Sequence, residues 1–563
     1  MSLKTSLTGG AALSVVLALS SGLAAHAATR HHHRAVRHVA HADGSAQLQS
    51  EIDELKSEVQ SLKASRDTEA SSQAQSQAQI DQLKGQLADA DARAQAAQQR
   101  VDSTIQTIPG EVKAEVAKNT PPSDKLYFHG ASLQIAGFTA LETIFRQHAE
   151  STDMGSSFSG IPYAQTPAGH TAETRFSARQ SRISALAQAN VSDTIKISGY
   201  GEFDFLGAAQ TANSNESNSY NPRVRNLYTT IDWKEGPGTL HVLAGQSWSL
   251  ATLTKDGLAP RTELSPLTID AQYVVGFTWA RQPQVRVSYT TDNHISVGVS
   301  VESPATTFYS SGNFIKGVTV TDTETGSGQF NSANSLSLNK WPDLIAKVAA
   351  DENLAGHNIH AEVYGLYRNF YARVGVPGGI TNESTSGGGV GAGIYAQVIP
   401  SYLDLQLSGL TGKGIGRYGS GQLPDATIDV NGNLHPINEW QALVGLIGHV
   451  GTKLDVYAYG GEEREKAYAS IDGTIYNGIG NPNYNDSGCG IEGTSSSTCV
   501  GNTHYLTQIS AGFWHRLYQG PWGRFQWGVQ YSYTHREGFE GDGFVPTANE
   551  NMIFTSFRFY PFQ

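Results

Sequence analysis

Between Leu126 and the C-terminus, apolar and polar residues alternate with a period of two, and this alternation constrains the fold most. In residues 524–533 the odd positions are apolar or aromatic, and the even positions are polar or glycine. Residues 195–205 and 295–302 repeat the pattern. A period of two is typical of β-strands, because successive side chains point to opposite faces of a sheet. The pattern predicts an all-β region, but alternation alone also fits a soluble sandwich.

The links between these segments distinguish the two alternatives. Short links alternate with long polar links along the chain. The short links are 190–194, 234–238, 291–294, 352–357, 400–402 and 451–453, and the long ones include 147–174, 207–221, 249–270, 303–339 and 467–503. Alternating short turns and long loops are typical of outer-membrane barrels, whereas a soluble sandwich has no reason to keep its long loops on one side. The sequence therefore predicts an all-β transmembrane barrel of about 16 antiparallel strands over residues 126–563.

Composition excludes several other classes of protein. The mean hydropathy of −0.32 is too low for a bundle of transmembrane helices, which needs repeated apolar runs of about 20 residues. The 2 cysteines exclude a disulfide-dense scaffold and a cysteine-rich metal domain. The net charge of −12 argues against a nucleic-acid-binding protein, whose phosphate contacts need a basic surface. No nucleic-acid partner is therefore expected.

The first 47 residues contain two segments that are not part of the barrel. Residues 1–27 combine Lys4, an apolar stretch at 13–19 and an Ala-His-Ala cleavage site, which together predict a cleaved signal peptide. Residues 28–47 are rich in histidine and arginine. Such a tract binds metal in some proteins and is a disordered cationic tail in others, and the sequence leaves both open.

Residues 48–108 carry a heptad pattern that predicts an α-helical coiled coil. Apolar residues alternate at spacings of four and three, and the first of them are Leu48, Ile52, Leu55, Val59 and Leu62. The same register reaches Ile80, Leu83 and Leu87 after a polar middle. β-branched residues at one seam position and leucine at the other favour a dimer. Residues 109–125 contain three prolines and are predicted to be a linker.

Six short segments of the barrel region resemble the DcaP-like trimeric outer-membrane porins. They are residues 175–182, 199–205, 222–225, 244–248, 281–284 and 557–562. The resemblance implies a sixteen-stranded barrel, a homotrimer and diffusion of small, often anionic solutes such as dicarboxylates, and the family also tends to carry an N-terminal coiled coil. The chain departs from the usual terminal aromatic residue, because Gln563 follows Phe562.

Charged residues on alternate strands indicate where solutes are selected. Arginine on the lipid face costs about 2–4 kcal/mol near the midplane, so the interior of the barrel is the favoured location. The arginines expected to line the pore are Arg175, Arg179, Arg182, Arg223, Arg225 and Arg286, and the acids opposed to them are Glu202 and Asp204. Arg179 and Arg182 have opposite strand parity, so both face inward only if a bulge separates them. The alternative is that these arginines pair with loop acids or lipid phosphates and select nothing.

Two loops contain further candidate residues. Residues 249–270 follow the fifth predicted strand, where many such porins fold a loop into the channel. This expected constriction loop contains Lys255, Asp256, Arg261 and Glu263. Cys489 and Cys499 lie in the longest loop, and they are expected either as an extracellular disulfide or as two free thiols. No metal site is predicted.

No catalytic motif is present. The sequence contains no HExxH, GxSxG, CxxC or phosphate-binding loop, and the glycine-rich run 387–393 opens a strand rather than a helix. We therefore expect a porin without cofactors, located in the outer membrane of a Gram-negative bacterium, with the coiled coil in the periplasm. Its expected partners are two further copies, lipid and lipopolysaccharide, small anionic solutes and peptidoglycan. The alternatives are a structural barrel that tethers the envelope through its coiled coil, and an outer-membrane hydrolase.

Overall fold

The computed structural model describes residues 44–107, 125–150, 152–207, 221–309, 318–324 and 336–562. The chain divides into two compact units, Met1–Thr120 and Pro121–Gln563, and each is described by itself. The predicted signal peptide, most of the histidine-rich segment and nearly all of the predicted linker lie outside the described residues.

The first unit contains one long helix, α1 (Gly44–Thr107). Several apolar residues of the heptad seam are exposed on it, namely Ile52, Leu55, Val59, Ile80 and Leu83. An isolated helix gains nothing from such a seam, so the seam lacks its packing partner in a single chain. Among the described residues, no helix is both long and apolar enough to cross a membrane.

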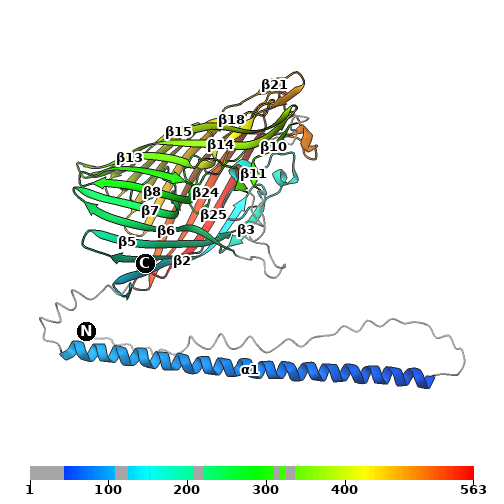
Figure 1. Cartoon of the computed structure of the whole chain (residues 1–563), viewed down its shortest axis with the longest axis vertical. Helices are drawn as coiled ribbons and strands as arrows, with labels where there is room; N and C mark the ends of the chain where they lie inside the picture. The colour runs from blue at the N-terminus through cyan, green and yellow to red at the C-terminus, as the bar shows by residue number, and fades with distance from the viewer. Residues whose placement is uncertain are drawn as a thin grey trace, which may run out of the picture. The chain divides into compact units, whose positions relative to one another are not determined.

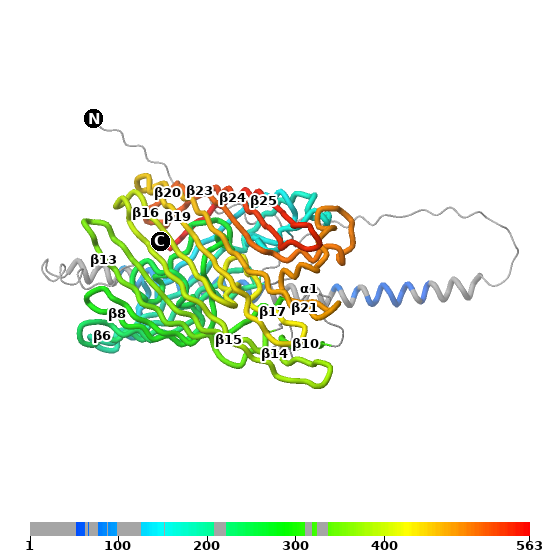
Figure 2. The backbone as a smooth tube through the Cα atoms, turned by 90° about the horizontal axis from the view of Figure 1, so that it is seen from above, coloured from blue at the N-terminus to red at the C-terminus, as the bar shows by residue number. Residues whose placement is uncertain are grey.

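The second unit is a closed antiparallel barrel whose wall has 16 strand positions (Figures 1 and 2). In chain order the wall strands are β2 (Ala131–Arg146), β4 (Arg182–Asn190), β5 (Ile195–Gly207), β6 (Asn221–Glu235), β7 (Gly238–Trp248), β8 (Arg281–Thr291), β9 (Ile295–Glu302), β13 (Asp343–Leu354), β14 (His357–Val376), β15 (Gly379–Ile399), β16 (Leu403–Lys413), β19 (Asn438–Val450), β20 (Leu454–Glu465), β23 (Thr503–Gly520), β24 (Gly523–Gly538) and β25 (Thr547–Tyr560). Each strand pairs with its neighbours along the wall, and β25 pairs with β2 to close it. The predicted barrel is confirmed.

The remaining strands are short additions. Three of them extend the wall, namely β1 (Leu126–Phe128), β3 (Glu173–Ser177) and β10 (Thr319–Thr321). The other six form small hairpins between wall strands, namely β11 (Thr323–Glu324), β12 (Leu336–Ser337), β17 (Ala426–Ile428), β18 (Leu434–Pro436), β21 (Ser470–Asp472) and β22 (Ile475–Asn477). β3 and β4 share one wall position, because they pair with the second and first halves of β2 respectively.

The long loops lie at one end of the barrel, together with the two-residue turn between β14 and β15, and the opposite end has short turns. Turns of two to four residues join β4 to β5, β6 to β7 and the following pairs, whereas segments such as 249–280 and 466–502 join strands at the other end. We call these the short-turn end and the long-loop end. The start of β2 and the end of β25 both lie at the short-turn end (Figure 1).

The wall is apolar outside and polar inside. In β9, Val297, Val299 and Val301 are exposed on the outer face, whereas Ser296 and Ser300 are fully buried on the inner face. Inward side chains of other strands are likewise buried and polar, among them Gln406, Gln441, Gln508, Gln530, Ser510 and Ser532. A soluble sandwich buries its apolar face, so this inverted arrangement removes that alternative and fits a wall that meets lipid outside.

The glycine run 387–393 lies within β15 and makes room for aromatic rings on the inner face. A Cβ on Gly391 would lie 2.2 Å from the ring of Tyr364, and one on Gly387 would lie 2.7 Å from the ring of Phe370. Glycine is therefore required here by close packing across β14 and β15. The run belongs to a strand, as the sequence indicates.

Candidate functional site: an arginine-lined cavity inside the barrel

The loop between β7 and β8 folds into the barrel. We call residues 249–280 the first inner loop. Wall side chains that hydrogen-bond to its backbone come from β13, β20, β23 and β24, and they are Lys347, Glu463, Gln508 and Gln530. Because these strands lie in different parts of the wall, the loop crosses the interior. The predicted constriction loop is thus the first part of an inward-folded segment that continues to Ala280.

A second loop, residues 414–437, folds inward and meets the first. We call it the second inner loop. Thr278 and Gly419 form an isolated β-bridge, and the backbone N–H of Trp279 donates to the carbonyl oxygen of Tyr418 at 2.8 Å. Tyr418 is fully buried. The two loops pack together in hydrophobic clusters that fill part of the interior.

A cavity of about 440 Å³ lies beside the first inner loop. Its charged lining consists of the arginines Arg182, Arg225, Arg261, Arg516, Arg524 and Arg558 and the acids Glu202, Asp204, Glu263, Asp270 and Asp455. Aromatic side chains complete it, including Tyr200, Tyr228, Trp248, Tyr273, Trp514 and Tyr560. Five of the arginines belong to wall strands, whereas Arg261 belongs to the loop. A charged, water-accessible cavity bounded by a loop and a basic wall is suited to selecting small solutes by charge.

Ion pairs hold the basic side chains of β6 against the acids of β5. Arg225 lies 2.7 Å from Glu202 and 3.0 Å from Asp204, measured between nitrogen and carboxylate oxygen. Arg223 lies 2.6 Å from Asp204, and Arg182 of β4 lies 3.7 Å from Glu202. Charge-assisted pairs of this kind fix the geometry of both groups. Glu202 and Asp204 therefore position the arginines rather than oppose them across the channel.

A bulge in β6 brings Arg225 inward. The register with β5 shifts between Glu202, which faces Asn226, and Phe203, which faces Val224. Arg225 is the extra residue, and both it and Asn226 are buried on the inner face. A bulge of one residue re-aims a side chain in this way.

Two acids of the first inner loop, Glu263 and Asp270, are largely buried. Burial raises the pKa of Glu263, although Arg286 lies 3.7 Å away. Burial also raises the pKa of Asp270, which is 1% exposed. Desolvation favours the neutral form of a carboxyl group. The lining therefore holds six arginines and five acids, and burial shifts the pKa of two of these acids upward.

Known proteins were compared with this chain. No protein-family model matches the sequence, and no curated protein matches it. Among solved structures, the outer membrane channel DcaP of Acinetobacter baumannii is similar with 18% identity and a TM-score of 0.52, over 77% of this chain and 99% of that chain. The anion-selective porin from Comamonas acidovorans aligns over 76% of this chain and 99% of its own, with 12% identity and a TM-score of 0.40. OprB of Pseudomonas putida aligns over 80% and 96%, with 10% identity and a TM-score of 0.43.

The barrel has a DcaP-like porin fold. The similarity to DcaP extends over nearly the whole length of that channel, and the closed wall of 16 strand positions agrees with it. The resemblance seen in the sequence is thus confirmed for the fold. At this level of identity the comparison concerns the fold alone, so the function is argued from the residues of this chain.

In this porin barrel, only some of the predicted pore residues line the cavity. Arg182, Arg225, Glu202 and Asp204 do so. The others lie outside its lining and pair with neighbouring acids, Arg175 with Glu173, Arg179 with Asp153, Arg223 with Asp204 and Arg286 with Glu263. The bulge that would let both Arg179 and Arg182 face inward is not needed, because the strand is interrupted between them: β3 ends at Ser177 and β4 begins at Arg182.

The four predicted residues of the constriction loop divide between two cavities. Arg261 and Glu263 line the cavity described above. Lys255 and Asp256 line a second cavity of about 460 Å³, together with strand residues such as Asn353, which lies near the end of β13 at the short-turn end. The first inner loop therefore reaches from the main cavity towards the short turns of the barrel.

Sequence reasoning missed three wall arginines. Arg516, Arg524 and Arg558 of the last three strands line the cavity beside the closure of the barrel. A signal for two of them was present. Arg524 has the polar parity of residues 524–533, and Arg558 stands between the exposed residues Phe557 and Phe559. A charged residue on the polar parity of a barrel strand faces the interior.

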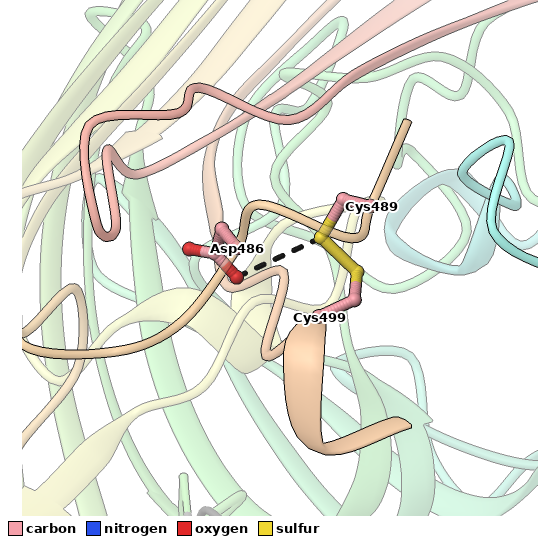
Figure 3. A group of neighbouring side chains, drawn as sticks. All are labelled: Asp486, Cys489 and Cys499. Carbon is pink, nitrogen blue, oxygen red and sulfur yellow. Dashed lines mark hydrogen bonds between the residues drawn. A yellow bond between two sulfur atoms is a disulfide. The ribbon is translucent and has the colours of Figure 1, made fainter. Parts of the chain in front are cut away.

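Cys489 and Cys499 form a disulfide in the loop 466–502 (Figure 3). An oxygen of Asp486 lies 3.7 Å from the sulfur of Cys489. Asp486, Cys489 and Cys499 are close enough together to resemble a small set of metal ligands. Sulfur atoms in a disulfide are not thiolate ligands, so this group is no metal site in the oxidised protein. The disulfide packs against Ile161 and Tyr163, which links this loop to the loop 147–172.

Proposed function

We propose that this protein is an outer-membrane porin whose water-filled channel favours small anionic carboxylates. The observation that carries the proposal is the cavity lined by six arginines beside the first inner loop. Two further observations support it, namely the apolar outer face of the barrel and the polar inner face. An anion entering this cavity meets guanidinium groups on the wall and on the first inner loop.

Liposome swelling tests the proposed anion preference. Vesicles containing the protein are exposed to a dicarboxylate and to a neutral sugar of similar size. The double variant Arg261→Ser/Arg524→Ser should slow entry of the dicarboxylate and leave entry of the sugar unchanged. In a water-filled channel, a guanidinium charge about 6 Å from the passing carboxylate lowers the free energy of that anion by about 0.7 kcal/mol. Each lost arginine should therefore slow entry of the anion about threefold.

The matched control is Arg175→Ser. Arg175 lies outside the cavity lining, its side chain is 42% exposed, and it pairs with Glu173. This variant should swell like the wild type with both solutes. Equal slowing of the dicarboxylate in the control and in the double variant would contradict the assignment of the cavity arginines.

We further propose that the protein is a homotrimer and that α1 forms a coiled coil in the periplasm. The exposed heptad seam of α1 supports self-association. The location of the start of β2 at the short-turn end supports a periplasmic helix, because short turns face the periplasm in this class. A trimer is preferred to the dimer that the heptads favour, because the barrel has the fold of a porin.

Deletion of residues 45–108 separates assembly from tethering. Loss of trimers in detergent, measured by light scattering, with unchanged conductance per chain supports an assembly role. Unchanged trimers together with a leaky envelope support the alternative of a tethering role. In that role α1 reaches towards peptidoglycan, because a helix rises about 1.5 Å per residue and a long helix spans a correspondingly long distance.

A further inference from the structure

Two glutamates lie side by side on the inner wall at the long-loop end. Glu439 stands near the start of β19 and Glu465 at the end of β20, and they are directly opposite each other in the register of these strands. Glu439 is 6% exposed and Glu465 is fully buried. Directly opposite residues of an antiparallel pair have Cβ atoms about 5 Å apart. Two carboxyl groups are thus held together away from water.

These carboxyl groups lack hydrogen-bond donors. Within the part of the chain that the structure describes, Oε1 of Glu439 and both carboxylate oxygens of Glu465 are buried without a partner. A buried carboxylate without compensation costs several kcal/mol. Something that the protein chain does not supply must therefore balance this pair.

The nearby cations are already engaged. Arg368 pairs with Asp343 at 3.2 Å and with Asp425 at 2.5 Å. Arg417 pairs with Asp343 at 3.3 Å. In the described part of the chain, these two guanidinium groups pair with Asp343 and Asp425, and neither forms an ion pair with Glu439 or Glu465.

A neighbouring acid brings no compensation to the pair. Glu463, two residues before Glu465 on the inner face, accepts backbone N–H groups of Gly276 and Gly421, which belong to the two inner loops. These donors are neutral backbone groups, so they add no positive charge beside Glu439 and Glu465.

Backbone oxygen also approaches Glu439. A Cβ on Gly416 would lie 2.2 Å from the carbonyl oxygen of Leu423 and 2.9 Å from Oε2 of Glu439. Glycine at this position of the second inner loop lets a carbonyl and a carboxylate oxygen converge on the same space. Carboxylates together with carbonyl oxygens are the ligands that Ca²⁺ prefers.

We propose that Glu439 and Glu465 bind a Ca²⁺ ion between β19 and β20, with the carbonyl oxygen of Leu423 as a further ligand. The ion neutralises the buried pair and fastens the second inner loop to the wall. Ca²⁺ is favoured over Mg²⁺, because it accepts irregular sets of oxygen ligands, whereas Mg²⁺ demands near-ideal octahedral geometry. Glu439 and Glu465 do not line the arginine-lined cavity. A test of calcium binding is therefore independent of the proposed solute preference.

Calcium binding to the purified full-length chain tests this site. The protein is refolded in detergent without lipopolysaccharide, treated with a chelator and dialysed against ⁴⁵Ca²⁺. The wild type should bind one tightly held ion per chain, and its apparent Tm should rise with calcium. The variant Glu439→Gln/Glu465→Gln should lose both effects. The control Glu462→Gln, which changes an outward residue paired with Arg464, should keep both.

The outcomes are distinct. A wild-type chain that binds no calcium overturns the proposal, and it indicates that protons balance the pair instead. Calcium that remains bound in the double variant overturns it as well. If the double variant does not fold, the single variant Glu439→Gln replaces it, and undiminished calcium binding there contradicts the assigned ligands.

Discussion

At the scale of single residues, Arg225 has the largest effect on the cavity. Its guanidinium group bonds to both Glu202 and Asp204, and Asp204 also accepts from Arg223. Arg225 is 4% exposed and bonds to both carboxylates, while Arg182 lies 3.7 Å from Glu202 and Arg223 donates two hydrogen bonds to Asp204. The bulge that places it inward is therefore a structural requirement of the site as well as a source of positive charge.

Removing Arg225 should destabilise the barrel. Arg225→Leu removes a charge-assisted bond from each of two buried carboxylates, and breaking a buried pair costs about 3–5 kcal/mol. Arg223→Leu is the comparison, because the side chain of Arg223 is 37% exposed and its loss should cost less. Urea unfolding in lipid vesicles measures both free energies. Equal losses in the two variants would contradict the role given to burial.

At the scale of elements, the loops contain buried ionisable side chains whose protonation affects how firmly the loop is held. Within the loop 147–172, Glu150 is buried and accepts the backbone N–H of Ser157 at 2.8 Å. Burial raises the pKa of Glu150 to about 7, although Arg146 lies 3.6 Å away. The folded loop therefore prefers the protonated form of this side chain.

This preference predicts a pH-dependent loop. The pKa of Glu150 is higher in the folded loop than its ordinary value of 4.5, so stability is greatest below that value and falls as pH rises through about 7. The loss amounts to about 3 kcal/mol. Limited proteolysis of residues 147–172 should be faster at pH 8 than at pH 5. Glu150→Gln should remove most of this difference, whereas the exposed turn variant Glu235→Gln should retain it.

Strands were predictable from sequence, because each follows from a local pattern. Alternation places Val297 outside and Ser296 inside without any knowledge of the partners. The paths of the inner loops were not predictable in this way. Gln530 bonds to Ile269 across 261 positions of the chain, and no local pattern marks glutamine at such a position as a contact for a loop. The break that aligns Arg182 with the cavity is likewise set by pairing with β2.

At the scale of the whole molecule, two features define the channel. The wall is apolar outside and polar inside, and the arginine-lined cavity lies on one side of the interior. The wall presents apolar residues outward, while the two inner loops leave a cavity on the side of the wall where β4–β6 and β23–β25 lie. The net charge of −12 does not describe this interior. Charge at the narrow part of a channel, rather than total charge, determines which ions pass.

The reversal potential of wild-type channels in a planar lipid bilayer tests this account most directly. Under a gradient of potassium chloride, the potential at zero current gives the relative permeability of chloride and potassium. Because six arginines line the cavity, the sign of the reversal potential should correspond to anion preference. This preference should weaken at higher salt, because salt screens the arginines. Cation preference, or the absence of any conductance, would contradict the central claim.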